Sequence, residues 1–425
     1  MDFAKHLEKY LSKEEIDSLI SSFDEKEHKG VYLNTRKISD ERFVNLFPHV
    51  KKHPFVEHAY LYDQDEYDLG KKVYHEQGAY YIQDPSAAIV ASLLPLKGNE
   101  RVLDLCAAPG GKTVQASLRL GNNGILVSND LSKPRAMTLL QNVERMGLDN
   151  VVVTYLDFSK LSSKYKNYFD AIILDAPCSG SGMFRKSEAM KNDWTYEKVI
   201  KFSEIQKELI LMAFSMLKDG GTMVYSTCSY SYEEDEEVIQ YLLEKTQAIL
   251  GQIPEITGNL RSKKYPETIH LFPNLFPGEG HYIALIKKPG NLTENKVIER
   301  DVLRNATGKG QAKETQVYHL KNEIDEKLIE LSLRPGLFMK TIIGKKEIPT
   351  HHYSHASSSK DSIELTKEEV IQYLSGNQIR KNNPDGYYFV SYLGMNLGLV
   401  HSVNGVLKNL YPKGLRINAK INDSF

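Results

Sequence analysis

The strongest constraint on the fold is a regular alternation of short apolar runs and longer helical runs after residue 100. Helical patterns such as 133–146 and 196–217 separate most of the apolar runs. Strands that alternate with helices form βα units, whose mostly parallel sheet is covered by helices on both faces. No ordinary crossover helix lies directly before the last run, so we expect that strand to be antiparallel. The predicted strands are 101–105, 125–129, 151–156, 171–174, 222–226 and 281–287.

The segments on either side of this α/β core have a different pattern. Before it, VYLNTRKIS is a candidate strand, and Asp84-Pro85 has the pattern of a helix N-cap followed by proline at the first helical position. After Pro289 the sequence becomes polar, which indicates a linker or solvated patch followed by short β-like runs. We therefore divide the chain into an N-terminal region (1–95), the core (96–289), a linker with a small intermediate module (290–365) and a C-terminal β module (366–425).

Composition excludes several classes of protein. The 425 residues are 41% hydrophobic and 26% charged, which is typical of a globular chain with several cores. No apolar run reaches the roughly 18 residues of a membrane span, and the first 20 residues resemble an amphipathic helix more than a signal peptide. Three cysteines are too few for a disulfide framework or a four-cysteine zinc site. We expect a cytoplasmic protein without metal.

Charge is distributed unevenly along the chain. The formal net charge is only −1, but residues 286–425 contain 21 Lys and Arg against 15 Asp and Glu. The tail is therefore basic and the rest acidic, as expected for a catalytic body with a nucleic-acid-binding appendage. Unpatterned surface charge is the alternative explanation.

The segment Val102–Thr113, VLDLCAAPGGKT, has the pattern of a ligand-binding loop. An apolar strand is followed by small residues and two glycines that open a helix, so backbone amides can approach a bound group closely. A Walker loop would need glycine where Cys106 stands, and the dinucleotide pattern G-x-G-x-x-G is absent. The remaining option is the looser loop of S-adenosylmethionine-dependent methyltransferases. The predicted cofactor-binding loop residues are Cys106, Ala107, Ala108, Pro109, Gly110, Gly111 and Lys112.

Acidic residues end four consecutive strands of the predicted core. In an open α/β sheet the ligand crevice lies beyond the carboxyl ends of the strands, so these side chains should meet there. Asp130 could accept both ribose hydroxyls, and Asp157 could accept from an adenine amino group. Arg135 is either a ligand contact or a surface residue. A single such acid would more often be an exposed loop residue, but four acids after consecutive strands argue against coincidence. These four are Asp104, Asp130, Asp157 and Asp175.

Two cysteines follow strands of the same edge. Cys178 lies in DAPCSGSG and Cys228 in STCSY, after neighbouring strands of the predicted sheet. Buried structural thiols are the simplest alternative. A metal pair lacks further ligands, since His351, His352 and His355 lie in a distant polar segment. A redox pair lacks the C-x-x-C spacing.

Methylation of a cytosine would use two such sulfurs. Carbon 5 of cytosine becomes nucleophilic once a thiolate has added to carbon 6, and a second thiol can help to release the product. A carboxyl group near ring nitrogen 3 can take up the developing charge, with its pKa raised by the enclosed site. Asp175 is placed for that role.

The three motifs DLCAAPGGKT, LDAPCSGSG and STCSY together resemble the Nop/Sun family of RNA 5-methylcytosine methyltransferases. YIQDPSAAIVASLL and YLNTRKIS resemble the segments that precede this core in the family. The C-terminal modules are similar to those of the bacterial RsmF-like branch, whose last module is PUA-like.

The resemblance implies a function and a role for each motif. It implies a seven-stranded Rossmann-like core, an N-terminal α+β RNA-binding region and a PUA-like β module. Cys228 would be the nucleophile and Cys178 the release residue, while the loop, Asp130, Asp157 and Asp175 would bind S-adenosyl-L-methionine. The implied substrate is 16S rRNA or the 30S subunit. A tRNA methyltransferase and a non-catalytic assembly factor are the alternatives.

Several residues are candidates for RNA contact in the monomer that we expect. Basic residues near the C-terminus and two residues after the Pro-Cys turn could neutralise phosphates. Aromatic residues in the C-terminal strands are more often buried in the core of the module than exposed for stacking on RNA bases. The basic candidates are Lys408, Lys413, Arg416, Lys420, Arg185 and Lys186, and the aromatics are Tyr387, Tyr388, Phe389 and Tyr392.

Overall fold

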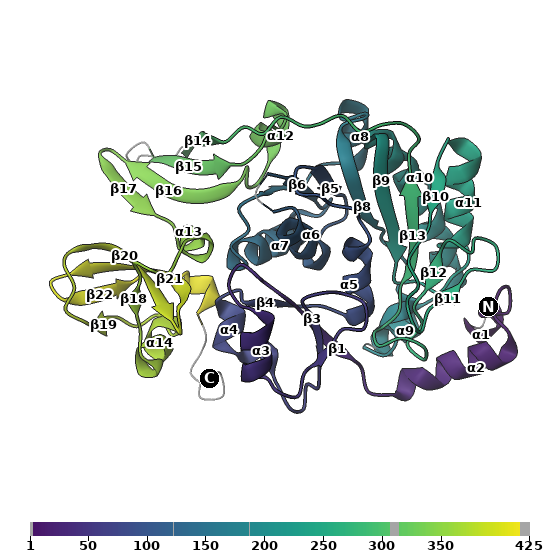
Figure 1. Cartoon of the computed structure of the whole chain (residues 1–425), viewed down its shortest axis with the longest axis horizontal. Helices are drawn as coiled ribbons and strands as arrows, with labels where there is room; N and C mark the ends of the chain where they lie inside the picture. Colours follow the sequence, from purple (N-terminus) through teal and green to yellow (C-terminus); the bar gives the residue numbers. More distant parts are fainter. Residues whose placement is uncertain (1–2, 122, 187, 307–313, 417–425) are drawn as a thin grey trace.

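The computed structural model describes residues 3–121, 123–186, 188–306 and 314–416. Within these ranges the strands form four sheets, of which the largest lies at the centre (Figure 1). The N-terminal region lies below the central sheet in this view, and the two C-terminal sheets lie to its left. Lys420, one of the predicted phosphate contacts, is outside the described residues.

The central sheet has the predicted α/β topology. Its described strands run in the order β11-β12-β13-β9-β8-β5-β6-β7, with β10 paired to β13. All six predicted strands are present. The five strands from β5 to β9 are parallel, and β13 is antiparallel to β9, as the missing crossover helix indicated. The bounds are β5 (Arg101–Asp104), β6 (Ile125–Asn129), β7 (Val151–Thr154), β8 (Phe169–Asp175), β9 (Leu217–Thr227), β10 (Ile249–Gly251), β11 (Leu260–Arg261), β12 (Ile269–His270) and β13 (Tyr282–Lys287).

The strand count differs from the seven that the family resemblance implies. The described part of the sheet has nine strands, because β11 and β12 add to β13 at its amino end. Each of these two strands is two residues long. Such short segments carry no readable alternation of apolar and polar residues, so the sequence pattern could not reveal them.

Helices cover both faces of this sheet, and the strand sequences explain why. Val102 and Leu103 point to opposite faces, and both are fully buried in separate apolar clusters. One cluster joins the sheet to α5 (Pro85–Ser92), α6 (Gly111–Arg119) and α7 (Lys133–Arg145). The other joins it to α8 (Phe158–Lys164), α10 (Tyr196–Met216) and α11 (Glu236–Lys245). The short helix α9 (Glu188–Asp193) follows the Pro-Cys turn.

The N-terminal region forms a four-stranded antiparallel sheet beside α5. Asp84 caps α5, and Pro85 stands at its first position, as predicted. The predicted strand after Gly30 ends at Leu33, earlier than expected. The predicted single amphipathic helix is two helices, because Ser12 forms a capping box that begins the second. The elements are α1 (Phe3–Leu7), α2 (Lys13–Ser21), β1 (Lys29–Leu33), α3 (Asp40–Leu46), β2 (Lys51–Lys52), β3 (Ala59–Tyr62), α4 (Val73–Glu76) and β4 (Tyr80–Ile82).

Two further sheets follow the core. The first contains β14 (Arg300–Ala306), β15 (Glu314–Leu320), β16 (Leu337–Ile343) and β17 (Lys346–Pro349), with α12 (Glu326–Leu331) and α13 (His351–Ala356). The second contains β18 (Ile363–Glu364), β19 (Ile379–Arg380), β20 (Gly386–Tyr392), β21 (Met395–Val403) and β22 (Val406–Asn409), with α14 (Lys367–Leu374).

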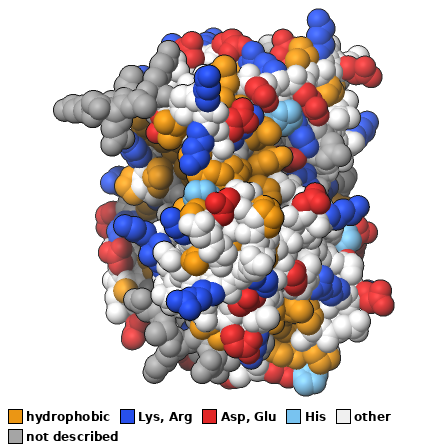
Figure 2. Space-filling view, turned by 90° about the vertical axis from the view of Figure 1, so that its left-hand side faces the viewer, with side chains coloured by type: hydrophobic (Ala, Val, Ile, Leu, Met, Phe, Trp, Pro, Cys, Tyr) orange, Lys and Arg blue, Asp and Glu red, His pale blue; other side chains and the backbone are white. Residues whose placement is uncertain are grey.

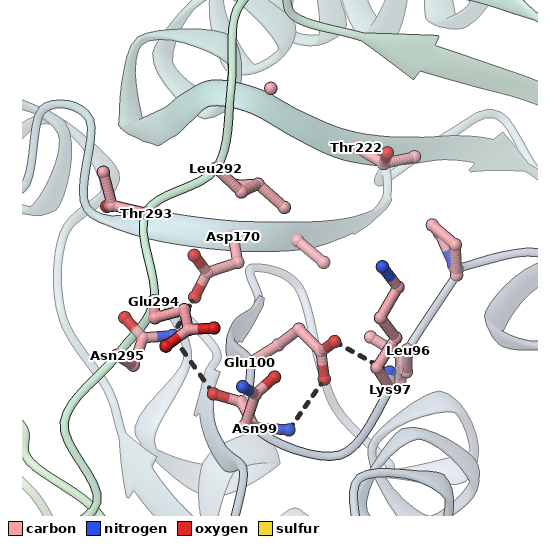
Figure 3. Close-up of a pocket in the computed structure, with 13 residues that line it drawn as sticks. Leu96, Lys97, Asn99, Glu100, Asp170, Thr222, Leu292, Thr293, Glu294 and Asn295 are labelled. Atoms are coloured by element: carbon pink, nitrogen blue, oxygen red, sulfur yellow. Dashed lines mark hydrogen bonds between the residues drawn. The ribbon is translucent and has the colours of Figure 1, made fainter.

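The polar linker after Pro289 is attached to the amino edge of the central sheet. Asn295 Nδ2 donates to Asn99 O at 3.1 Å and to Asp170 Oδ2 at 2.7 Å (Figure 3). Lys218 Nζ donates to Asp170 Oδ1 at 2.6 Å and to Asn295 Oδ1 at 2.8 Å. The pocket drawn in Figure 3 is lined by this linker and by the starts of the strands. It therefore lies at the opposite edge of the sheet from the predicted site.

The intermediate segment closes the exposed edge of the sheet at β7. Leu333 N donates to Val153 O at 2.8 Å, and Val153 N donates to Arg334 O at 2.9 Å. The Arg334 guanidinium is buried and donates to Leu148 O at 2.8 Å and Val151 O at 3.3 Å. These contacts cover an edge strand that would otherwise present unpaired backbone groups.

We expect Arg334→Ala to lower the free energy of unfolding by about 3 kcal/mol, because two charged hydrogen bonds and a filled buried site are lost. Arg300→Ala is the matched control: its ion pair with Glu326 is largely exposed, so we expect a loss of less than about 0.5 kcal/mol. Urea unfolding followed by circular dichroism measures both. Equal losses for the two variants would contradict the edge-closing role.

Candidate active site

The five parallel strands β5 to β9 of the central sheet end at the predicted ligand edge. The in-register pairing of β8 with β9 places Asp175 beside Ser226. The next residues of each strand lead into the turns that carry the two cysteines, and Ala176 N donates to Ser226 O at 2.9 Å. Residues that are 50 positions apart in sequence are therefore neighbours in the site.

The two cysteine sulfurs lie against each other. Cys178 Sγ and Cys228 Sγ are 3.1 Å apart, and both residues are free thiols of intermediate exposure. The hydrogen bond to Cys228 and burial raise the pKa of the Cys178 thiol well above its usual value. Among the described residues no group of three or more metal-ligating side chains is present.

Close backbone packing holds the two turns in this position. Gly182 N donates to Cys228 O at 2.8 Å. A Cβ atom at Gly182 would lie 2.8 Å from that oxygen and 3.0 Å from Glu279 O. Only glycine fits between these backbone segments, which accounts for the glycine-rich sequence after Cys178.

Asp175 is paired with Lys112 from the cofactor loop. Lys112 Nζ donates to Asp175 Oδ2 at 2.7 Å, and Ser226 Oγ donates to Asp175 Oδ1 at 2.6 Å. Burial alone would raise the pKa of Asp175, but the Lys112 ammonium and these hydrogen bonds hold it below its usual value. The expected rise in this pKa is wrong, because the sequence did not show that Lys112 would lie beside the carboxylate.

The predicted cofactor loop connects β5 to α6 at the same edge. Gly110 has a φ of +119° and precedes the first residue of α6, and the loop side chains Ala107 and Ala108 are small. A Cβ atom at Gly111 would lie 3.2 Å from Gln83 Nε2. Gly111 therefore lets the start of α6 pack closely against the N-terminal region, while the loop backbone amides stand at a helix N-terminus, which favours an anionic group.

Asp130 and Arg135 both contact this loop. Ala108 N donates to Asp130 Oδ2 at 3.3 Å, and Arg135 Nη2 donates to Ala108 O at 2.8 Å. Asp130 Oδ1 accepts from Ser132 N at 2.9 Å. The structure thus brings both residues to the predicted ligand edge.

Asp104, Cys106 and Asp157 have other contacts. Asp104 is fully buried and accepts from Thr113 Oγ1 at 2.7 Å, and burial raises its pKa to about 7. Cys106 packs against an apolar cluster, and burial raises the pKa of its thiol. Asp157 is exposed and caps α8 by accepting from Ser159 N at 2.9 Å. The strand-end pattern indicated a ligand for Asp157 but did not reveal this capping role.

Arg185 and Lys186 point toward acidic partners. The Arg185 side chain is buried and donates to both carboxylate oxygens of Glu279, at 3.2 and 3.0 Å from Nε. The predicted phosphate contact of Arg185 is therefore wrong, since burial removes its guanidinium from solvent. Lys186 Nζ lies 3.6 Å from Asp84 Oδ2 and stays partly exposed.

Two site residues were missed by sequence reasoning. His281 is buried, and Ser86 Oγ lies 2.9 Å from its Nδ1. Burial and the Lys112 ammonium lower the pKa of His281 to about 4. Glu234 is fully buried between the two cysteine turns. Neither residue stands in a recognisable motif. The only signal was the run of five acids from Glu233 to Glu237, which a soluble surface helix would also show.

Three family models match the chain in succession. Residues 1–85 match the N-terminal domain of 16S rRNA methyltransferase RsmF, residues 91–287 match 16S rRNA methyltransferase RsmB/F, and residues 360–417 match the methyltransferase RsmF PUA domain. No helix in the described ranges has the length and apolar character needed to cross a membrane.

Solved structures share the methyltransferase fold. A methyltransferase homologue from Pyrococcus horikoshii has a TM-score of 0.60 at 27% identity, covering 67% of this chain and 94% of that chain. NSun6 from Pyrococcus horikoshii with SFG has a TM-score of 0.61 at 21% identity, covering 68% and 98%. The second comparison supports the fold alone.

Curated relatives match nearly the whole chain. The ribosomal RNA small subunit methyltransferase F of Shewanella piezotolerans is 33% identical over 91% of this chain and 90% of its own length. The enzyme of the same name from Vibrio campbellii is 30% identical over 94% of each chain. The order of domains, the methyltransferase fold and this identity together show that the chain belongs to the RsmF family of methyltransferases.

Proposed function

We propose that this protein methylates carbon 5 of a cytidine in small-subunit ribosomal RNA, with S-adenosyl-L-methionine as methyl donor. The observation that supports this proposal most strongly is the 3.1 Å separation of the Cys178 and Cys228 sulfurs beside the loop of residues 106–112. Of two adjacent thiols, one can activate a pyrimidine ring by covalent addition and the other can assist release of the methylated product. Methylation of an amine or hydroxyl group would have no need of them.

The residues of the ligand edge fit the cofactor. Loop amides at the start of α6 can receive its carboxylate, and the Asp130 carboxylate beside Ala108 can accept ribose hydroxyls. Asp157 is exposed and accepts the capping hydrogen bonds of Ser159 N and Lys160 N through Oδ1. Its other oxygen, Oδ2, can therefore accept from an adenine amine. When bound, the cofactor supplies an electrophilic methyl group.

The chain's own residues prepare the cytosine ring. The Cys228 thiolate adds to carbon 6, so that carbon 5 gains nucleophilic character. Burial alone would lower the pKa of Lys112, but the charges of Asp175, Asp104 and Cys228 raise it. Its ammonium therefore stays protonated and can offset negative charge on the thiolate and on the ring. Asp175, held as a carboxylate, can accept from the exocyclic amine of cytosine.

Product release requires loss of the carbon 5 proton and cleavage of the bond from carbon 6 to sulfur. A base takes the carbon 5 proton, the electron pair of that carbon–hydrogen bond re-forms the ring double bond, and the pair of the carbon–sulfur bond returns to the Cys228 sulfur. Cys178, whose raised pKa keeps its proton in place, can donate a hydrogen bond to the leaving sulfur. This assignment of the two roles follows the family resemblance of the Thr-Cys and Pro-Cys motifs.

A row of side chains on the C-terminal sheet supports RNA binding. Cross-strand pairing places Tyr387, His401 and Lys408 side by side on β20, β21 and β22. The Tyr387 and His401 rings stack with centroids 4.3 Å apart, and Lys346 Nζ lies 5.2 Å from the Tyr387 ring. Figure 2 shows a band of hydrophobic side chains on the face with these sheets, with Lys and Arg as well as Asp and Glu around it. Aromatic rings beside lysines suit a single-stranded RNA segment.

Other predicted contacts in this region have different surroundings. Lys413 is exposed, whereas Arg416 packs tightly against Gly376 and has a buried Nε without a hydrogen-bond partner among the described residues. Lys408 and Lys413 are therefore better phosphate contacts than Arg416.

We also propose that the four-part division of the chain, a monomeric state and a cytoplasmic location hold for this enzyme. A tRNA substrate remains the second candidate.

We expect Cys228→Ala to abolish methyl transfer and Cys178→Ala to leave a covalent protein–RNA adduct. The reason is that the first variant cannot form the bond to carbon 6 and the second is slow to break it. Tritiated cofactor with separated ribosomal subunits, free rRNA and tRNA measures transfer, and a denaturing gel shows the adduct as a slow band. Lys327→Ala, which changes an exposed residue of α12, is the control and should retain activity. If the effects of the Cys178 and Cys228 variants are exchanged, the two roles are reversed.

We expect the double variant Lys346→Ala/Lys408→Ala to weaken RNA binding by about tenfold at 0.1 M salt, because two phosphate-neutralising charges are removed. Fluorescence anisotropy with a single-stranded rRNA fragment measures the dissociation constant and its salt dependence. Lys327→Ala removes a comparable exposed lysine, which is paired with Glu330 on α12, and should leave affinity unchanged. Equal affinities for the double variant and the wild type would exclude this surface.

A further inference from the structure

The carboxylate of Glu234 connects the two cysteine turns. On the Cys178 side, Ser179 N donates to Glu234 Oε1 at 2.8 Å, and Ser179 Oγ donates to Oε2. On the Cys228 side, Ser229 Oγ donates to Oε2 at 2.6 Å. Ser179 and Ser229 each directly follow a cysteine. One side chain is thus bonded to both residues that adjoin the reacting sulfurs.

A glutamine on α10 reinforces this link. Gln206 Nε2 donates to Glu234 Oε1 at 3.0 Å and to Pro177 O at 2.8 Å. The backbone on both sides of Cys178 is therefore tied to the same carboxylate, once directly and once through Gln206. Glu234 and Gln206 are both fully buried, so water does not compete for these bonds.

The hydrogen-bond pattern also favours the anionic form of Glu234. Oε1 accepts from Ser179 N and Gln206 Nε2, and Oε2 accepts from the two serine hydroxyls. A carboxylate has about four acceptor sites, so all of them are used. Burial raises the pKa of Glu234 above its usual value, and these four donated hydrogen bonds oppose that rise because they stabilise the anion.

We propose that Glu234 is a positioning residue of the two-cysteine reaction, which holds the Cys178 turn against the Cys228 turn and sets the distance between the sulfurs. This inference rests on the proposed function. The buried negative charge next to Ser179 also favours the thiol form of Cys178. Cys178 then keeps its S–H as a hydrogen-bond donor toward Cys228, and Cys228 is left as the attacking sulfur.

A purely structural role for Glu234 would have different consequences. The neighbouring Glu233 is also buried, but it contacts His6 of α1 and Lys9, which follows that helix, instead of the cysteine turns. Glu233→Ala is therefore a matched control for the loss of a buried glutamate from the same segment. Glu234→Gln is the conservative variant, since its amide can keep the bonds through Oε1 while removing the charge.

Disulfide formation measures the distance between the sulfurs without RNA or cofactor. Diamide oxidises the two thiols: each sulfur loses a proton, one S–S bond forms, and the electron pair reduces the N=N bond to a hydrazine. We expect Glu234→Ala to slow the Cys178–Cys228 disulfide by about tenfold or more, since misplacement by about 1 Å has large effects on such reactions. Glu234→Gln should recover most of the rate, and Glu233→Ala should match the wild type. Mass spectrometry of the linked peptides measures each rate.

The outcomes of this experiment separate the two roles. If Glu234→Ala and Glu233→Ala form the disulfide at the same rate, the proposal is wrong. If Glu234→Ala does not fold by circular dichroism, Glu234→Gln decides by a second measurement, the pH dependence of Cys178 alkylation. The lost charge should shift the alkylation midpoint to lower pH, and an unchanged midpoint would overturn the inference.

Methylation kinetics separate this proposal from the proposed function. We expect Glu234→Ala to lower kcat by at least about tenfold with little change in KM for RNA or cofactor, because the sulfurs and not the binding surfaces move. If the wild type neither methylates RNA nor forms an adduct, the proposed function fails, and the disulfide result still stands. If the wild type is active and Glu234→Ala has the kcat of Glu233→Ala, only the role of Glu234 fails.

Discussion

The candidate site depends on the in-register pairing of β8 and β9. Because these strands are parallel neighbours, Asp175 and Ser226 lie side by side, and the two turns that follow them leave the sheet at the same place. The resulting contact between Cys178 and Cys228 is the central feature of the site. A shift of one residue in this pairing would turn one side chain of each pair to the opposite face of the sheet.

Electrostatics at this edge are set by a small number of buried pairs. Lys112 places a positive charge beside Asp175 and near Cys228, which lowers the pKa of Asp175 although desolvation would raise it. Glu234 places a negative charge near Cys178. A cation near one thiol and an anion near the other provide a physical basis for different roles of two chemically identical groups.

The surrounding regions hold this edge in place. Asp84 caps α5 and also accepts from Glu279 N at 3.0 Å, while Glu279 is paired with the buried Arg185 of the Pro-Cys loop. The N-terminal region is thereby connected to the site as well as to the rest of the chain. At the far edge of the sheet, Arg334 links the C-terminal sheets to β7. The family models, which match three successive segments, agree with this architecture.

The sequence by itself determined the α/β core, because apolar strand runs and amphipathic helices have different periods that are readable locally. It also placed Cys178, Cys228, Asp130 and Asp175 at one edge, since the carboxyl ends of parallel strands coincide. Only the tertiary structure decided the partners of these groups. Lys112 beside Asp175, Glu279 beside Arg185 and Glu234 between the cysteine turns are contacts across long separations in sequence. Charge state and burial depend on such contacts, so neither the lowered pKa of Asp175 nor the buried ion pair of Arg185 could be predicted from local pattern.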